Sequence, residues 1–430
     1  MQNFFFKRIF YCSPAFAFAI PTFPVMILLP AIYVENYSLS LSQIGIVLFL
    51  AKIIDVISDP LMGWVNDKNV FSRKKWILIG AILAGTSLYN LILPYTFPNI
   101  LYLFVWISVL YLGWTIFQVS YLSIGYDLES NYEERSRLSA GREFFVLLGL
   151  LASVSFPVFY EGSNIKSEVF LVYLAIISGL VCIFFFLIFI KEKRKNVSHQ
   201  PFEFTKVLYE LKTNNYLRKL LFPWFVNSLA NSFPMVLFVF FISTVLDGQS
   251  SDQEFILFLY FLSAVLGMFF WIYMIRHIEK KDIWRLSMLI SSFIFIFVFF
   301  IQSGDIFLFS IISCLTGFCL GADMAIPPSI QCDITDYHKQ RFKKDISGIL
   351  FSLLIFSNKI TFAIATLVTF SLLDFFEYNF EDNTSDKSDL LLTIMYAGIP
   401  IIMKLFTVSS LRKFDLSKKK MEKITKNLYG

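Results

Sequence analysis

The chain alternates between long apolar runs and short polar segments. Twelve runs contain roughly 20 or more mostly apolar residues, the length that an α-helix needs to cross a bilayer. They cover approximately residues 10–34, 42–65, 76–97, 99–126, 139–160, 167–190, 217–246, 254–276, 283–302, 305–330, 346–373 and 390–411. The pattern predicts an all-α membrane protein with twelve transmembrane helices, arranged as two bundles of six.

The polar segments alternate in charge. Of the 37 Lys and Arg residues, nearly all lie at the termini or in every second connection. The exceptions are Lys52, Lys166, Lys359, Lys387 and Lys404. Because cytoplasmic loops are enriched in Lys and Arg, both termini are expected in the cytoplasm, with the protein in the plasma (inner) membrane.

The longest internal polar stretch predicts the domain boundaries. Residues 191–216 are expected to link a first six-helix bundle (1–190) to a second (217–412), followed by a basic cytoplasmic tail (413–430). Apolar residues recur at helical spacing in this linker, which predicts an amphipathic helix on the membrane surface; they are Phe204, Val207, Leu208 and Leu211.

Composition supports the membrane assignment and excludes several functions. The chain is 57% hydrophobic and 16% charged, against about 45–50% and about 25% in soluble domains. The net charge of +5 follows from topology, so no nucleic-acid partner is expected. The five Cys are scattered and the three His lie in polar segments, which argues against a metal site. We expect no cofactor beyond a coupling ion.

Two carboxylates inside the second apolar run are the main candidate site. Asp55 and Asp59 are four residues apart, so a helix places them on one face. A charge at membrane depth costs at least about 2.5–3.5 kcal/mol, and burial and mutual repulsion both disfavour two ionised carboxylates. A proton, a sodium ion or the nearby Lys52 can relieve this. The Ser58 hydroxyl and the Gln118 amide supply oxygens suited to sodium.

Other ionisable residues lie within predicted spans. Asp323 lies in the tenth span, Arg142 opens the fifth and Lys359 lies deep in the eleventh. Lys359 needs an anionic partner or a substrate, whereas an interfacial position is the alternative for Arg142 and Glu143. We expect Arg142, Lys359, Asp323 and Gln118 to contact a small-molecule substrate.

Five segments resemble, in order, the signatures of the glycoside–pentoside–hexuronide:cation symporters, the melibiose-carrier branch of the major facilitator superfamily. They are KIIDVISDPLMG at 52–63, YLSIGYDLESNYEERSRLSAGR at 121–142, NYLR at 215–218, DITDY at 333–337 with Lys359 beyond it, and YAGIP at 396–400 with FDL at 414–416. The resemblance implies a secondary transporter that works by alternating access, coupled to sodium or protons, and not an enzyme.

The resemblance also implies roles for single residues. Asp55, Ser58, Asp59 and Thr115 fall on the family's cation site, and Arg142 and Lys359 fall on its substrate cavity. Gly63, followed by Asp67 and Lys68, resembles the superfamily's loop 2–3 motif, in which an Asp and basic residues hold neighbouring helices together. We therefore assign gating roles to Gly63, Asp67, Lys68, Arg73, Asp333 and Asp336.

Three departures leave the substrate open. The family's helix-one and helix-four sugar-binding Asp fall on Ala19 and Gln118, and a neighbouring Trp falls on Leu122. A sugar or glycoside remains the expected substrate. An amphipathic solute is the alternative, because the sodium-coupled lysophosphatidylcholine carrier is a related branch.

An intramembrane transferase is the rival class. Prenyltransferases hold magnesium diphosphate with an N-x-x-x-D-x-x-x-D motif and a second acidic motif. Here Ala51 replaces the Asn, and one carboxylate pair is too few for that chemistry. The expected partners are a small-molecule substrate and the lipid bilayer, and the chain is expected to be a monomer.

Overall fold

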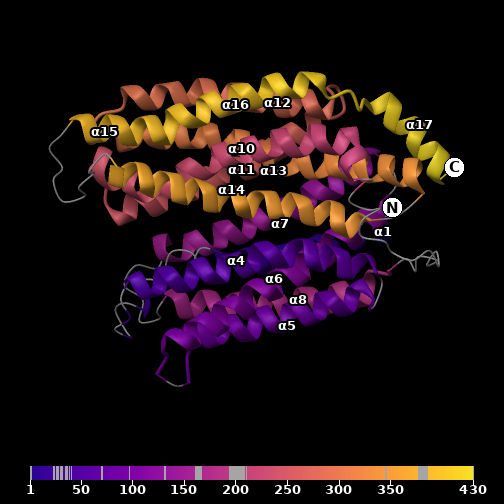
Figure 1. Cartoon of the computed structure of the whole chain (residues 1–430), viewed down its shortest axis with the longest axis horizontal. Coiled ribbons are helices and arrows are strands. Elements are labelled where there is room, and N and C mark those ends of the chain that lie inside the picture. The colour runs from indigo at the N-terminus through magenta and orange to yellow at the C-terminus, as the bar shows by residue number, and fades with distance from the viewer. Residues whose placement is uncertain are drawn as a thin grey trace. The chain divides into compact units, whose positions relative to one another are not determined.

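In the computed structural model, helices make up most of the residues that it describes (Figure 1). These are residues 2–22, 25, 29, 32, 33, 37, 39, 41–68, 71–95, 97–129, 132–159, 167–192, 209, 211–343, 346–375 and 386–429. The amphipathic helix predicted in the linker falls almost entirely outside them. The expectation of an all-α membrane protein is confirmed.

The chain divides into two compact units. Unit 1 comprises Met1–Phe204 with His338–Phe356, and unit 2 comprises Thr205–Tyr337 with Ser357–Leu428. Helices α13 (Ile306–Phe342) and α14 (Ser347–Phe375) therefore each divide between the units. The sequence predicted a boundary at the linker, but not that the first turns of α14 pack with the N-terminal half of the chain.

Unit 1 is built on α1 (Gln2–Cys12), α2 (Pro14–Ala19), α4 (Leu41–Asp67), α5 (Arg73–Ile92), α6 (Ile100–Leu128), α7 (Tyr132–Phe159) and α8 (Ser167–Phe189). Helix α6 packs against both α4 and α5, and α2 packs against α7 and α8. A core of aliphatic and aromatic side chains, including Leu88, Leu103 and Leu110, joins α4, α5, α6 and α8.

Unit 2 contains α10 (Asn215–Phe240), α11 (Ser250–Met274), α12 (Lys280–Ile296), α15 (Asp386–Thr393), α16 (Ile399–Ser410) and α17 (Lys418–Tyr429), with most of α13 and α14. A π-helical turn extends α10 to Val245, and another joins α15 to α16. Helix α16 packs against α10 and α12. Phe241 stacks on Tyr396 in the core, with ring centroids 4.4 Å apart.

Most predicted spans match an observed helix. Ten helices in the described part of the chain are long and apolar enough to cross a membrane. The second predicted span is α4, which has 27 residues but carries three charged residues in its apolar stretch. The first span corresponds to α1 and α2, beyond which many residues are not described.

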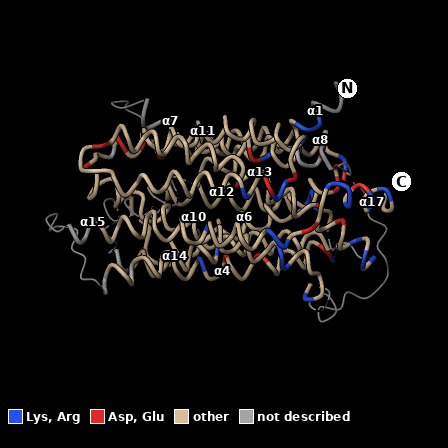
Figure 2. Tube along the Cα trace, turned by 90° about the horizontal axis from the view of Figure 1, so that it is seen from above, with Lys and Arg blue, Asp and Glu red and all other residues tan. Residues whose placement is uncertain are grey.

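The tenth helix is longer than its apolar run. The hydropathy pattern ends this span near residue 330, but α13 continues for three more turns to Phe342 and passes through Pro327 and Pro328. The last turns carry polar and charged residues, because a helix can continue after it leaves the apolar layer. Figure 2 shows Lys and Arg gathered toward one end of the helices in each unit, near α1 in unit 1 and near α17 in unit 2.

Candidate functional site

Asp55 and Asp59 lie buried on one face of α4, where Thr115 of α6 meets them. The three residues are at most 2% exposed. The Thr115 hydroxyl oxygen lies 2.9 Å from Asp59 Oδ1 and 3.3 Å from Asp55 Oδ1. A hydroxyl has one proton to donate and two lone pairs, so Thr115 can bond to one carboxylate and still offer oxygen to a cation.

Ser58 and Lys52 complete this group on α4. The Ser58 hydroxyl donates to the Asp55 carbonyl oxygen at 2.8 Å and lies 3.2 Å from the Thr115 hydroxyl. The Lys52 ammonium pairs with Asp55 Oδ2 at 2.9 Å and also lies over the Tyr111 ring. With both carboxylates ionised, Lys52, Asp55 and Asp59 carry one net negative charge.

Three other expected site residues lie outside this group. Gln118 follows Thr115 by one helical turn but is exposed, and in the described part of the chain no hydrogen bond joins its amide to either carboxylate. Arg142 is buried in unit 1, where its guanidinium group pairs with Glu143. Lys359 is half-buried on α14 and belongs to unit 2.

Asp67 caps the first turn of α14. Its Oδ1 accepts from the Gly348 backbone N–H at 2.9 Å, and its Oδ2 accepts from the Ile349 backbone N–H at 2.8 Å. A carboxylate at a helix N-terminus satisfies N–H groups that have no intrahelical partner and interacts favourably with the helix dipole. A Cβ at Gly63 would lie 2.5 Å from Ser352 Oγ, so glycine permits the close approach of α4 to α14.

Arg73 is buried beside Asp67 and links four segments of unit 1. Its guanidinium group lies 3.7 Å from Asp67 and 2.6 Å from Asp127 at the end of α6. It also donates to the Ser347 hydroxyl at 3.1 Å, while its backbone N–H donates to Glu192. The sequence indicated Asp127 only as an interfacial residue at the end of its span, and it did not indicate Ser347, which has no unusual position in the hydropathy pattern.

The remaining residues expected in a gate lie in different surroundings. Lys68 lies over the Trp64 ring, 3.5 Å from its centroid. In unit 2, Asp333 pairs with Lys280 at 2.7 Å, and both side chains are buried. Asp336 is fully buried three residues further along α13.

Asp323 lies at the centre of a buried polar group in unit 2. Its carboxylate accepts hydrogen bonds from Trp284, Asn227 and Asn231 at 2.6, 3.1 and 3.0 Å. Lys404 lies 3.5 Å from it. The sequence singled out Asp323 but not the Asn and Trp side chains, because a neutral polar residue in an apolar run gives little signal.

A group of three or more His, Cys, Asp or Glu side chains arranged to hold a metal ion is not found among the described residues. The oxygen atoms of Asp59, Thr115 and Ser58 lie close together where α4 meets α6. They suit a monovalent ion or a proton, whose single charge matches the net charge of the group.

The comparison with known families decides the identity of this helical chain. Residues 10–418 match the family model described as MFS/sugar transport protein. The chain belongs to this family. It is therefore a multi-pass membrane transporter and not an enzyme, and the resemblance to cation symporters found in the sequence is confirmed.

Relatives of the transporter share low sequence identity over nearly its full length. The putative glycoside/cation symporter YagG of Escherichia coli is 22% identical over 418 residues, covering 94% of this chain and 90% of that protein. The sodium-dependent lysophosphatidylcholine symporter 1 of Gallus gallus is 20% identical over 449 residues, covering 92% of this chain and 84% of that protein.

The fold also resembles a solved transporter structure. The fucose:proton symporter FucP of Escherichia coli superposes with a TM-score of 0.67 at 14% identity, covering 94% of this chain and 99% of that chain. At this identity the likeness concerns the fold alone. It agrees with the twelve-helix architecture expected from the sequence.

Proposed function

We propose that the transporter is a symporter in which a sodium ion or proton bound at Asp59 drives uptake of a small sugar- or glycoside-like solute by alternating access. The observation that carries this proposal is the contact of one Thr115 hydroxyl with two buried carboxylates on α4. A charged group inside a membrane span marks a functional site by default. Here two carboxylates, Asp55 and Asp59, both contact the Thr115 hydroxyl.

The charges of this group give a reason for coupling. Lys52 neutralises Asp55, so the group keeps one negative charge when Asp59 is ionised and no ion is bound. That charge costs about 2.5–3.5 kcal/mol at membrane depth. A bound monovalent cation or proton removes it, so the transporter would change conformation more readily when the ion is present.

The ligand chemistry favours sodium over a proton as the coupling ion. Asp59, Thr115 and the nearby Ser58 offer carboxylate and hydroxyl oxygen atoms, and hard cations are bound by oxygen ligands. A proton needs only the carboxylate. We place the transporter in the plasma membrane as a monomer with cytoplasmic termini, in keeping with the charge of its connections.

For the substrate, we propose contacts with Arg142 and Gln118 of unit 1, and we propose Lys359 as a substrate-binding residue of unit 2. The exposed amide of Gln118 can both donate and accept hydrogen bonds, as sugar hydroxyls require. The name of the relative YagG supports a glycoside. The relation to a lysophosphatidylcholine symporter keeps an amphipathic solute as the alternative.

The contacts of Asp67 support a gating role for the loop after α4. Asp67 and Arg73 tie the ends of α4, α5 and α6 to the first turn of α14. Such a joint is held by polar contacts at helix ends and can break without unpacking an apolar core. We propose that it opens and closes once in each transport cycle.

The experiment that tests coupling compares the intact transporter with its Asp59→Asn variant in proteoliposomes. A panel of monosaccharides, glycosides and lysophosphatidylcholine is first screened for thermal stabilisation of the purified protein. Accumulation of the best ligand is then measured under an inward sodium gradient and under an inward proton gradient. We expect Asp59→Asn to retain exchange of the ligand but to lose ion-driven accumulation.

Asp247→Asn is the matched control, because it makes the same chemical change at an exposed loop residue. It should accumulate the ligand as the unaltered protein does. If Asp59→Asn still accumulates ligand against a gradient in response to either ion, Asp59 is not the coupling residue.

A further inference from the structure

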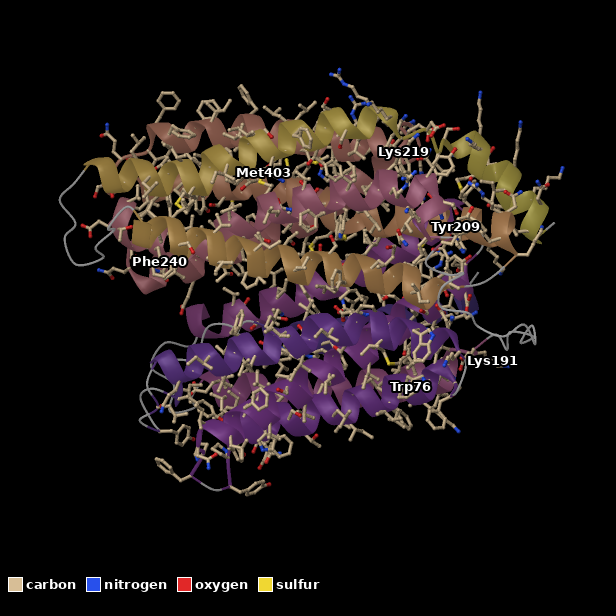
Figure 3. All side chains as sticks on the ribbon, viewed as in Figure 1. Trp76, Lys191, Tyr209, Lys219, Phe240 and Met403 are labelled. Atoms are coloured by element: carbon tan, nitrogen blue, oxygen red, sulfur yellow. The ribbon has the colours of Figure 1, made fainter. Side chains whose placement is uncertain are left out.

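Lys404 lies in the middle of α16 with its ammonium group surrounded by oxygen atoms. Its neighbour Met403 marks this level in Figure 3, far from either end of the helices of unit 2. Lys404 is 3% exposed. Its Nζ lies 2.7 Å from Asn231 Oδ1, 3.2 Å from Asn227 Oδ1 and 3.5 Å from Asp323 Oδ2.

The surrounding hydrogen bonds fix these oxygen atoms in place. The amide nitrogens of Asn227 and Asn231 both donate to Asp323 Oδ2, which leaves both amide oxygens for Lys404. Trp284 Nε1 donates to Asp323 Oδ1 at 2.6 Å. The site is thus assembled from α10, α12 and α13, and the ammonium enters it from α16.

We propose that this group is a monovalent-cation site whose resident cation is the ammonium of Lys404. One carboxylate and two amide oxygens are ligands that hard cations use, and an ammonium carries the same single charge as sodium. The ammonium is covalently attached to the chain and cannot leave the site, so the negative charge of Asp323 is always compensated. The inference concerns unit 2 alone and does not depend on the ion site in unit 1.

A cation site and an ordinary structural ion pair respond differently to the removal of Lys404. If an ion pair is all that matters, removal of Lys404 leaves Asp323 as an uncompensated buried charge, which is strongly destabilising whatever the salt. If the oxygen atoms form a cation site, a small free cation can take the place of the ammonium. In that case Asp323 is a ligand of this cation and not the substrate-binding residue that the sequence had predicted.

The test is cation rescue of a Lys404→Ala variant. It is made with Asp59→Asn, so that sodium binding at the site proposed in unit 1 does not contribute. Thermal unfolding of the purified protein is followed in choline, sodium and methylammonium chloride at equal ionic strength. Relative to Asp59→Asn alone, we expect Lys404→Ala to lower the Tm in choline, and sodium or methylammonium to restore it in a concentration-dependent manner.

Lys404→Ala combined with Asp323→Asn is the matched control. It removes both charges, so it should unfold at the same temperature in all three salts. The proposal is overturned if Lys404→Ala unfolds at one temperature in all three salts, or if the charge-free control responds equally. Failure of Lys404→Ala to fold in every salt, while the control folds, also overturns it, because a free cation then cannot replace the ammonium.

Discussion

Lys52 is the residue that sets the charge of the proposed ion site. Its ammonium group lies 2.9 Å from Asp55, so this carboxylate already has an internal cation. The Asp55 carboxylate can bind an external ion only if its ion pair with Lys52 is broken. The number of ions bound per transporter therefore depends on this one side chain.

We predict that Lys52→Met increases the number of monovalent cations or protons bound. The variant removes the ammonium group that pairs with Asp55, and the charge of this carboxylate must then be compensated in another way at membrane depth. Sodium binding and proton uptake by the purified protein measure the change. Lys52→Arg keeps the charge and should bind as the unaltered protein does; an unchanged stoichiometry in Lys52→Met would contradict the role given to Lys52.

A second prediction concerns Asp67, whose two carboxylate oxygens accept hydrogen bonds from backbone N–H groups at the N-terminus of α14. In Asp67→Asn only one acceptor oxygen remains, and the amide N–H₂ group faces a backbone donor. Loss of a helix cap costs about 0.5–2 kcal/mol. We expect a lower Tm and a changed transport rate, measured on the same reconstituted protein.

The effect of Asp67→Asn can be compared with that of Ser72→Ala, which removes the side-chain cap of α5. Ser72→Ala should lower the Tm with little change in transport. If both variants change transport in proportion to their loss of stability, Asp67 is a structural cap only and the proposed gate is wrong.

At Gly80, the backbone of helix α5 closely approaches the backbone of α6. A Cβ at Gly80 would lie 2.6 Å from the Phe117 backbone nitrogen and 2.7 Å from the Gly113 carbonyl oxygen. Backbone atoms of a helix cannot move aside as a flexible side chain can. Close packing of small residues is a main source of helix association in membranes, where apolar surface gains little by leaving lipid.

Gly80→Ala should therefore destabilise unit 1, by about 1–3 kcal/mol if the helices must shift apart. Gly85 lies on the same helix, but a Cβ there meets no atom within 4 Å. Gly85→Ala should leave the Tm unchanged or raise it, because alanine favours helix over glycine. Thermal unfolding of both variants decides; equal Tm values would show that the close contact of α5 with α6 does not limit stability.

The orientation of the complete chain in the membrane is a prediction from its charge pattern. Connections rich in Lys and Arg are expected in the cytoplasm, and the exposed residues Arg412 and Lys413 follow the last span. The loop between α12 and α13, which contains Ser303, lacks Lys and Arg and is expected outside.

Cysteine labelling with a membrane-impermeant reagent tests this orientation. In intact cells we expect Ser303→Cys to react, and Asn427→Cys on α17 to react only after permeabilisation. The five native cysteines are buried or half-buried, so their own labelling should be weak. Labelling of Asn427→Cys in intact cells would reverse the assigned topology.

The sequence by itself determined the features that depend on residues close together in the chain. Apolar runs of about 20 residues gave the helices, because a bilayer requires backbone groups to bond within each segment. The spacing of Asp55 and Asp59 placed both carboxylates on one helical face. The order of short motifs along the chain indicated the family that the comparison confirmed.

Only the tertiary structure decided which distant residues meet. Thr115 is 56 residues from Asp59, and Lys404 is 173 residues from Asn231. The resemblance marked Thr115, but no local pattern marks Asn231, since Asn in an apolar run costs little and follows no required spacing. Their contacts depend on how side chains of several helices interlock, as where Gly63 lets α4 approach α14. That packing is decided by the whole set of neighbouring side chains, which is why the oxygen atoms around Lys404 became visible only in the folded chain.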